Sequence, residues 1–275
     1  MKKLEAEIPD SLWHALKHHV KAGSNSVDQV LCDALSTYLE AEPNTLFQVS
    51  TASALVAGIY HGTVTLGALR HHGDLGLGTF ENLDGELMIV DGECFQACAD
   101  GVVQQVGDEV LTPFALITKF LPTHEATVNC SSMDDLKVQY DKLRDSDNLA
   151  YALKVTGTFD YVHVRTMCRT DDGVPLVRAA EQQAEFKFEN LSGTLVGFWS
   201  PEYVKSLNVP GYHLHFLSRE HQKGGHLLDC TGRGLKIELQ REVAFSVVLP
   251  DSAEFRHADF THDPSEDLRR AESKP

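Results

Sequence analysis

Basic residues are scarce in this chain. Its 275 residues include 24 Lys plus Arg against 40 Asp plus Glu, which gives a formal net charge of −16 at pH 7. Binding to nucleic acids or to anionic membranes depends on clustered Lys and Arg that displace counterions or meet lipid head groups. The acidic balance therefore disfavours both kinds of partner and favours a small molecule or another protein. A chain of this length can form one large domain or two ordinary ones.

Long apolar runs and paired cysteines are also missing. No stretch approaches the run of about 18 apolar residues that a membrane-spanning helix needs. The chain begins MKKLEAEIPDSLW, which places acidic residues where a signal peptide has its apolar segment, so we expect a cytoplasmic protein without a membrane anchor. The six cysteines are scattered with no CxxC motif. This pattern fits neither a disulfide framework nor a cysteine zinc site, and we expect reduced thiols.

Residues 1–43 differ in pattern from the rest of the chain. Lys3–Ile8 is typical of a short strand, and the apolar spacing over residues 12–20 and 27–39 predicts two amphipathic helices. This order resembles a ribbon-helix-helix module, in which outward-facing strand residues read DNA. Here glutamates take the outward positions, and the segment has seven acidic residues against four lysines. We therefore expect it to support dimerisation or to be a simple helical decoration, with DNA binding disfavoured.

From Leu46 onward, strand-like runs separated by turn residues dominate. Asp-Gly pairs at residues 84, 91 and 100 predict a β-meander. Helices are expected at Ala52–Tyr60, Leu66–His72, after Pro113, Asp134–Leu143 and Ala179–Glu185. Strands resume at Ala152–Thr166, Phe186–Trp199, Tyr212–Ser218, Gly225–Cys230 and Leu235–Leu249. Because strands outweigh helices without a regular βαβ rhythm, we predict an α+β fold with mixed sheets. The last 25 residues are polar, and on pattern alone they are a tail.

Three histidines form the most informative constellation. In a strand over Tyr212–Ser218, His213 and His215 point to the same face, because successive side chains alternate. The polar loop that follows can reverse the chain and place His226 opposite the pair. Three neutral imidazoles on a rigid hairpin suit Zn²⁺ or a similar divalent ion. His221 is a competing ligand, although it lies on the expected turn.

The residues around these histidines resemble the metal site of bacterial α-acetolactate decarboxylases. They are Gly-Tyr-His213-Leu-His215-Phe-Leu-Ser and Gly-Gly-His226-Leu-Leu-Asp. The segments 48–60, 73–87 and 159–169 and the C-terminal Leu-Arg-Arg-Ala-Glu272 fit the same family in order and spacing. The resemblance covers residues from about 45 to 273, with residues 1–43 outside it.

This resemblance implies a fold, an activity and partners. The fold is a two-subdomain catalytic region over residues 44–275, with a boundary at about 145–150, preceded by the strand-helix-helix extension 1–43. The activity is the conversion of 2-acetolactate, a 2-hydroxy-3-keto acid, to acetoin and CO₂ with one Zn²⁺ or another divalent metal per chain. A homodimer or higher homo-oligomer is implied as well.

Matched residue by residue, the resemblance also implies a set of site residues. The metal ligands are His213, His215 and His226. Glu86 takes the place of the acid beside the metal, and Thr79 that of a pocket threonine. Arg165 matches the arginine that meets the substrate. Arg169 lies four residues later on the same strand face and is a close rival. At Cys168, between the two arginines, the sequence departs from the family pattern, so the pattern does not decide which arginine is the match. Glu272 matches a C-terminal glutamate that folds back into the site.

These residue types suit the chemistry. Loss of CO₂ from a β-keto acid leaves an electron pair that the ketone must absorb, which gives an enediolate. Zn²⁺ that chelates the ketone and hydroxyl oxygens can hold this charge, and an arginine offers a planar fork for the departing carboxylate. A buried carboxyl group can then deliver a proton to the carbon. Which glutamate does so is not decided by the sequence.

Two other functions compete with this one. A cupin-like metalloprotein also has an HxH motif followed by a glutamate, here His213, His215 and Glu220, but the second cupin motif with its own histidine is missing downstream. A DNA-binding regulator with a decarboxylase-derived sensor domain is the other alternative. The retained histidines, Glu86 and the arginines favour an active enzyme, and the acidic first strand disfavours DNA.

Overall fold

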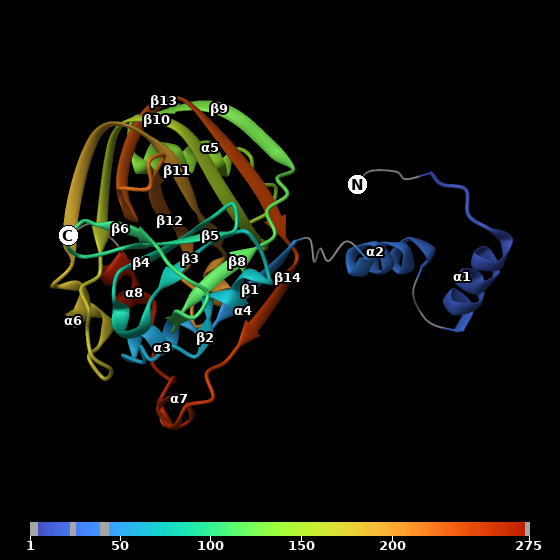
Figure 1. Ribbon diagram of the computed structural model, residues 1–275, viewed down its shortest axis with the longest axis horizontal. Helices are drawn as coiled ribbons and strands as arrows, with labels where there is room; N and C mark the ends of the chain where they lie inside the picture. Colours follow the sequence, from blue (N-terminus) through green and yellow to red (C-terminus); the bar gives the residue numbers. More distant parts are fainter. Residues whose placement is uncertain (1–4, 23–25, 39–43, 273–275) are drawn as a thin grey trace. The chain divides into compact units, whose positions relative to one another are not determined.

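The chain forms two compact units, Met1–Pro43 and Asn44–Pro275. The computed structural model describes residues 5–22, 26–38 and 44–272 (Figure 1). None of the helices in these ranges is both long and apolar enough to cross a membrane.

The first unit contains the two predicted helices, α1 (Asp10–Ala22) and α2 (Val27–Tyr38). The strand predicted at Lys3–Ile8 is not found: residues 5–9 have no strand conformation, and Lys3 and Leu4 lie outside the described residues. A short extended segment satisfies its backbone groups only when a second strand pairs with it. No strand among the described residues does so. The ribbon of a ribbon-helix-helix module is therefore absent from the described part of this unit.

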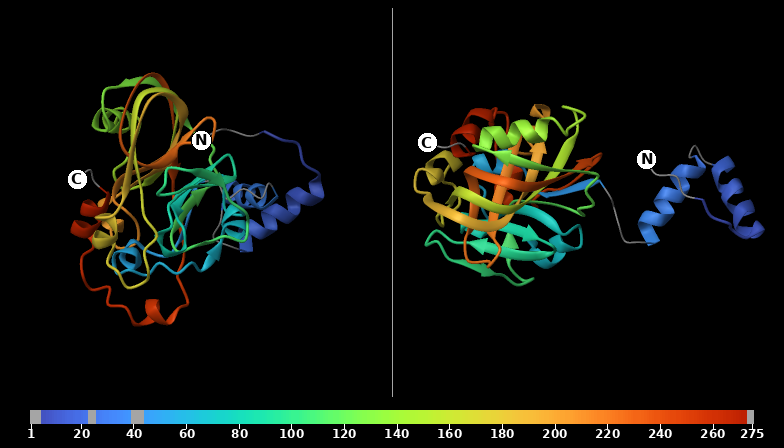
Figure 2. Two further views of the ribbon diagram at one scale, coloured as in Figure 1. Left: turned by 60° about the vertical axis from the view of Figure 1, so that its left-hand side comes forward. Right: turned by 90° about the horizontal axis from the view of Figure 1, so that it is seen from above.

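The second unit is built on two sheets, so the predicted α+β class with mixed sheets is confirmed (Figures 1 and 2). The larger sheet has the order β14 (Ala244–Val248), β1 (Thr45–Val49), β8 (Ala115–Thr118), β3 (Leu75–Thr79), β4 (Glu86–Val90), β5 (Glu93–Ala97) and β6 (Val103–Gln105). The smaller sheet has the order β10 (Ala150–Thr166), β11 (Ala184–Ser200), β12 (Gly211–Ser218), β13 (Gly224–Glu242) and β9 (His124–Cys130). Strands β2 (Val64–Thr65) and β7 (Leu111–Thr112) form a separate pair.

The predicted β-meander corresponds to strands β3 to β6. Its β4–β5 turn has Asp91 at φ 51° and Gly92 at φ 81°, and two successive positive φ angles make the tight turn that suits the twist of a hairpin. The helix predicted after Pro113 is wrong. That segment is strand β8, which lies between β1 and β3 and is buried along its whole length. A short run that is apolar on both faces has neither a helical nor a strand period, so its pattern could not separate the two.

The smaller sheet closes on itself, because β10 pairs with both β11 and β13 (Figure 2). The strands predicted at Gly225–Cys230 and Leu235–Leu249 are in fact the long β13 and the short β14, and β14 crosses to the larger sheet and runs parallel to β1. β9 belongs to the smaller sheet although it precedes residue 145. The two sheets therefore interleave along the chain instead of following one another.

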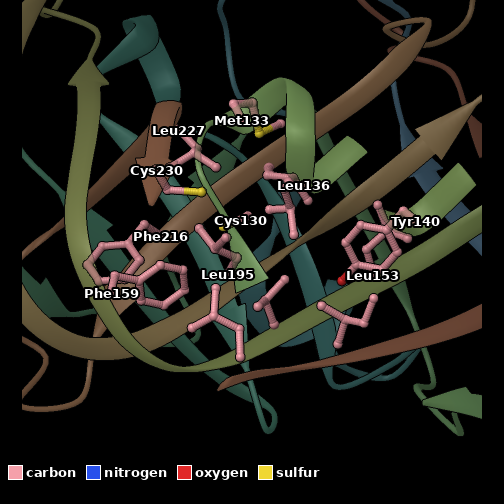
Figure 3. Packing of buried hydrophobic residues seen from close by; sticks show 14 of the residues in the cluster. Cys130, Met133, Leu136, Tyr140, Leu153, Phe159, Leu195, Phe216, Leu227 and Cys230 are labelled. Atoms are coloured by element: carbon pink, nitrogen blue, oxygen red, sulfur yellow. The ribbon is translucent and has the colours of Figure 1, made fainter. Parts of the chain in front are cut away.

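The closed sheet surrounds the largest apolar core. Figure 3 shows ring and aliphatic side chains from several strands packed with those of helix α5 (Met133–Asp141). Phe159 and Phe216 meet edge to face, with ring centroids 5.5 Å apart. Leu136 and Tyr140 bury one face of α5 against the strands. This core holds β12 and β13 rigidly, and these strands carry the three histidines.

The remaining helices are short, namely α3 (Ala52–Val56), α4 (Leu66–Arg70), α6 (Leu176–Ala180), α7 (Ala253–His257) and α8 (Ser265–Glu272). The interpretation of the last 25 residues as a tail is wrong for α8. Leu268 and Ala271 are each 2% exposed and pack into a second apolar cluster. Two apolar residues three positions apart lie on one face of a helix, and this is enough to dock the C-terminal segment.

Candidate active site

The three predicted histidines meet in the structure. His215 on β12 stands directly opposite His226 on β13, and His213 lies two residues earlier on the same face of β12. All three are buried, and their ring centroids are 5.0 to 5.3 Å apart. One ligand nitrogen from each lies within 4.8 Å of the other two. The triad is a group that can hold a metal ion.

The protonation of this triad favours a metal. His215 Nδ1 lies 2.8 Å from the carbonyl oxygen of Leu87, and since a carbonyl only accepts, Nδ1 donates and leaves Nε2 with its lone pair. Burial lowers the pKa of His213 to about 3, and it holds the pKa values of His215 and His226 well below their usual range. All three are thus neutral at pH 7. The Nε2 atoms of His213 and His215 are 3.2 Å apart, close to the roughly 3.3 Å expected for two nitrogens on one tetrahedral zinc ion.

Two carboxylates from different elements of the fold face the triad. Glu86 begins β4 on the larger sheet, and its Oε2 is 3.6 Å from His215 Nε2. Glu272 ends α8, and its Oε2 lies 3.4 Å from His226 Nε2 and 3.6 Å from His213 Nε2. Burial raises the pKa of Glu86 to about 7, although the nearby Arg165 guanidinium acts in the opposite direction. A carboxyl group with this pKa can hold or release a proton near neutral pH.

Arg165 joins the two carboxylates. It lies near the end of β10, opposite His226, and it is 3% exposed. Its Nη1 is 3.2 Å from Glu86 Oε1, and its Nη2 is 3.3 Å from Glu272 Oε1. The backbone N–H of Met167 also donates to Glu86 Oε1, at 3.2 Å. The positively charged guanidinium of Arg165 is thus buried beside the triad, where its N–H groups face carboxylate oxygens.

Comparison with known proteins identifies this arrangement. The sequence profile of the α-acetolactate decarboxylase family matches residues 46–262. An α-acetolactate decarboxylase of Methanosarcina mazei is 39% identical over 256 residues, which cover 91% of this chain and 88% of that protein. One from Brevibacillus brevis is 37% identical, over 85% of this chain and 83% of that protein. The chain belongs to the α-acetolactate decarboxylase family.

Solved structures agree with this assignment. The crystal structure of the α-acetolactate decarboxylase from Bacillus subtilis strain 168 superposes with a TM-score of 0.80 at 32% identity, covering 84% of this chain and 100% of that one. The protein is therefore a decarboxylase with the acetolactate decarboxylase fold. The profile match includes the three histidines, Glu86 and Arg165 but ends before Glu272, so the structure places that residue independently.

Within this decarboxylase the two rival arginines are well separated. Arg169 lies three residues beyond the end of β10, its side chain is 63% exposed, and it pairs with Asp84 at 3.5 Å. Only Arg165 reaches the triad. Thr79 on β3 stands opposite Glu86 in the strand register, and its Oγ1 donates to the carbonyl oxygen of Gly85 at 2.8 Å. Thr79 therefore fixes the turn from which Glu86 emerges.

The competing ligands lie elsewhere. His221 sits on the exposed turn between β12 and β13 at φ 55°, with its ring centroid 4.4 Å from that of Phe95. Glu220, the glutamate of the cupin interpretation, is on the same exposed turn. Of the described residues, the group that can hold a metal contains neither. The cupin-like alternative is therefore not favoured.

An inner cavity of about 40 Å³ adjoins the triad. Its polar lining consists of Thr79, Glu86, Arg165, His213, His215 and Glu272. Its apolar lining includes Leu55, Phe114, Leu176 and Leu268, which the sequence analysis did not single out. An apolar residue that lines a cavity has the same pattern as one that fills a core, so no sequence signal distinguishes these four.

Proposed function

We propose that this decarboxylase converts 2-acetolactate to acetoin and CO₂, as a step of acetoin biosynthesis, with one Zn²⁺ or another divalent ion bound to His213, His215 and His226. The observation that carries the proposal is the convergence of three neutral imidazoles beside a buried arginine and two carboxylates. Zn²⁺ favours nitrogen donors in tetrahedral geometry, and a catalytic site provides three protein ligands with a position left open. When bound, the ion supplies a Lewis acid that stabilises the negative charge of an enediolate as CO₂ leaves.

Arg165 binds the carboxylate of the substrate in this proposal. Its guanidinium already lies within hydrogen-bonding distance of two carboxylate oxygens, one from Glu86 and one from Glu272. A substrate carboxylate can accept hydrogen bonds from the same guanidinium N–H groups. Holding that group beside the histidines orients the bond that breaks, so that its electron pair can pass to the neighbouring ketone.

Glu86 and Glu272 are the proposed proton donors. After CO₂ leaves, one proton must reach the carbon that lost it, and one electron pair returns from the enediolate oxygen to restore a ketone. A carboxyl group that remains partly protonated near pH 7 suits this step, and burial raises the pKa of Glu86 to about 7. Glu272 also lies beside the triad and is the alternative donor. Thr79 contributes by holding the turn at Gly85.

The decisive experiment measures acetoin and CO₂ from 2-acetolactate with purified protein before and after chelation. Turnover should disappear with the metal and return when Zn²⁺ is added back. His226→Gln should lose both metal and turnover, whereas His221→Gln, on the exposed turn, should keep both. A metal-replete protein that makes no acetoin, or one whose turnover survives complete removal of the metal, contradicts the proposal.

We also propose a homodimer or higher homo-oligomer in the cytoplasm, with residues 1–43 contributing to self-association. Several large apolar side chains of α1 and α2 are exposed, among them Leu12, Leu31 and Tyr38. A second copy of the chain can bury them. The regulator alternative is not favoured, because the family match and the complete set of site residues support an enzyme.

A further inference from the structure

The C-terminal end of helix α8 borders three cavities at the site. The inner cavity of about 40 Å³ that adjoins the triad is lined by Leu268 and Glu272 of this helix. Two surface cavities, of about 180 and 620 Å³, also border this helix, and His226 of the triad lines the larger one. Glu272 lines all three cavities. A substrate that enters from these cavities therefore passes the C-terminal end of α8.

Arg269 stands at this entrance. It lines both surface cavities, which also share Pro210, Gly211 and Glu272. It precedes Glu272 by three residues, so the two side chains lie on one face of the helix. The described residues include no carboxylate within ion-pair distance of Arg269, and its one hydrogen bond among them runs from Nε to the carbonyl oxygen of Ser265, at 3.2 Å.

Arg269 is the cation in these cavities that has no carboxylate partner among the described residues. Lys137, the second cation of the larger cavity, is paired with Asp134 at 2.8 Å. Asp229 lies in the same cavity, and Glu202 lines the smaller one. The chain as a whole has a net charge of −16, which repels an anion that approaches it. Among the described residues that line these cavities, Arg269 is thus the cation without an ion-pair partner, and a carboxylate in the larger cavity lies beside both Arg269 and His226 of the triad.

We propose that Arg269 is a positioning residue that receives the substrate's carboxylate at the entrance and directs it past Glu272 towards Arg165. The inference rests on the proposed function, since it requires an anionic substrate. Arg269 touches the substrate before the reaction and not during it. Its effect therefore falls on capture of the substrate, which kcat/KM reports, and much less on kcat.

Arg270 supplies the matched control. It is the next residue on the same helix, it is exposed, and it pairs with Glu266 at 2.5 Å while lining none of the three cavities. We expect Arg269→Gln to lower kcat/KM about threefold to tenfold at low ionic strength, with less than a twofold fall in kcat. Arg270→Gln should match the wild type. The difference between the two variants should shrink at about 0.5 M NaCl, where exposed charges are screened, and Arg269→Lys should recover part of the loss.

A binding measurement separates this inference from the proposed function. 2-Hydroxy-2-methylbutanoate has the hydroxyl and carboxylate groups of acetolactate but no ketone, so it cannot lose CO₂ by the same route. Titration calorimetry should show weaker binding of this acid to Arg269→Gln than to Arg270→Gln, and equal binding of its uncharged amide to both. Equal binding of the acid, or equal kcat/KM at low salt, overturns the role of Arg269. A wild-type protein that binds the acid through Arg269 but makes no acetoin overturns the proposed function alone.

Discussion

Glu86 allows the cleanest separation of metal binding from proton transfer. Glu86→Gln keeps the shape of the side chain and an oxygen that can accept from Arg165 and from the Met167 N–H, and it leaves the three imidazoles untouched. We expect the metal content to stay at the wild-type level while kcat falls on the order of 10²- to 10⁴-fold, because a positioned acid-base group is lost. Metal analysis and steady-state kinetics on the same preparation test this. Nearly full kcat with metal bound would mean that the proton comes from elsewhere, with Glu272 the next candidate.

The arginines offer a matched pair of substitutions. Arg165→Lys keeps the charge but loses the planar fork between Glu86 and Glu272, so we expect kcat/KM to fall by at least about tenfold. Arg169→Lys changes only an exposed side chain paired with Asp84 and should retain wild-type kinetics. Both variants should keep their metal. If Arg169→Lys loses its activity while Arg165→Lys keeps it, the roles assigned to the two arginines are reversed.

At the residue level, the sequence could predict which side chains share a face of a strand, because side chains alternate along it. Residues at i and i+2 share a face, so His213 and His215 could be paired, and the following turn could bring in His226. The same alternation left Arg165 and Arg169 equivalent at i and i+4. The structure separates them because β10 ends at Thr166, before Arg169. The end of a long strand depends on the neighbours with which it pairs, and the sequence does not show these.

At the level of elements, predictions failed where the local pattern was short. The buried run of β8 has no distinguishing period, and the long β13 could not be recognised as one strand because Gly232 and Gly234 interrupt its pattern. Its register against β9 is also irregular between Gly232 and Leu235. Helix α8 has only two buried residues. Its polar pattern by itself predicts a tail, and it is the family resemblance at Glu272 that indicates a place in the site, because the docking of α8 depends on tertiary contacts.

The packing of α8 leads to a prediction of its own. Leu268 lines the inner cavity and is 2% exposed, so Leu268→Ala removes buried apolar contacts that hold the helix. A buried Leu→Ala change typically costs about 2 to 5 kcal/mol. Because α8 is a terminal helix, we expect much of this cost to appear as local undocking instead of global unfolding.

Hydrogen exchange and kinetics measure that undocking. In Leu268→Ala the amides of residues 265–272 should exchange faster and kcat should fall, since Glu272 leaves its place, while the ligands on β12 and β13 keep the metal. Leu249→Ala, which changes a leucine that is 53% exposed, is the control and should behave as the wild type. Unchanged exchange across α8 in Leu268→Ala would show that other contacts hold the helix.

For the whole molecule, the site is a product of the complete second unit. The histidines come from the smaller sheet, Glu86 from the larger sheet and Glu272 from the C-terminal helix. The hydrogen bond between His215 and the carbonyl of Leu87 ties the two sheets together at the site itself. No single stretch of sequence contains this arrangement.

The first unit can be tested by removal. A chain that begins at Asn44 keeps every proposed site residue, so we expect its turnover per bound metal to equal that of the full-length protein. It loses α1 and α2, whose Leu12 and Tyr38 are 55% and 85% exposed. Because such side chains favour burial against another copy, the shortened protein should have a lower oligomeric order or a lower solubility.

Light scattering coupled to size-exclusion chromatography reports the oligomeric order, and kinetics normalised to metal content report the turnover. Replacing Leu12 and Leu31 with serine in the full-length protein should reproduce the effect of the deletion, because it removes apolar contacts without shortening the chain. An unchanged oligomer after deletion would exclude self-association through this unit. A truncated protein that is folded and metal-loaded but inactive would instead give residues 1–43 a part in catalysis, and specific binding of duplex DNA by the full-length protein would restore the regulator interpretation.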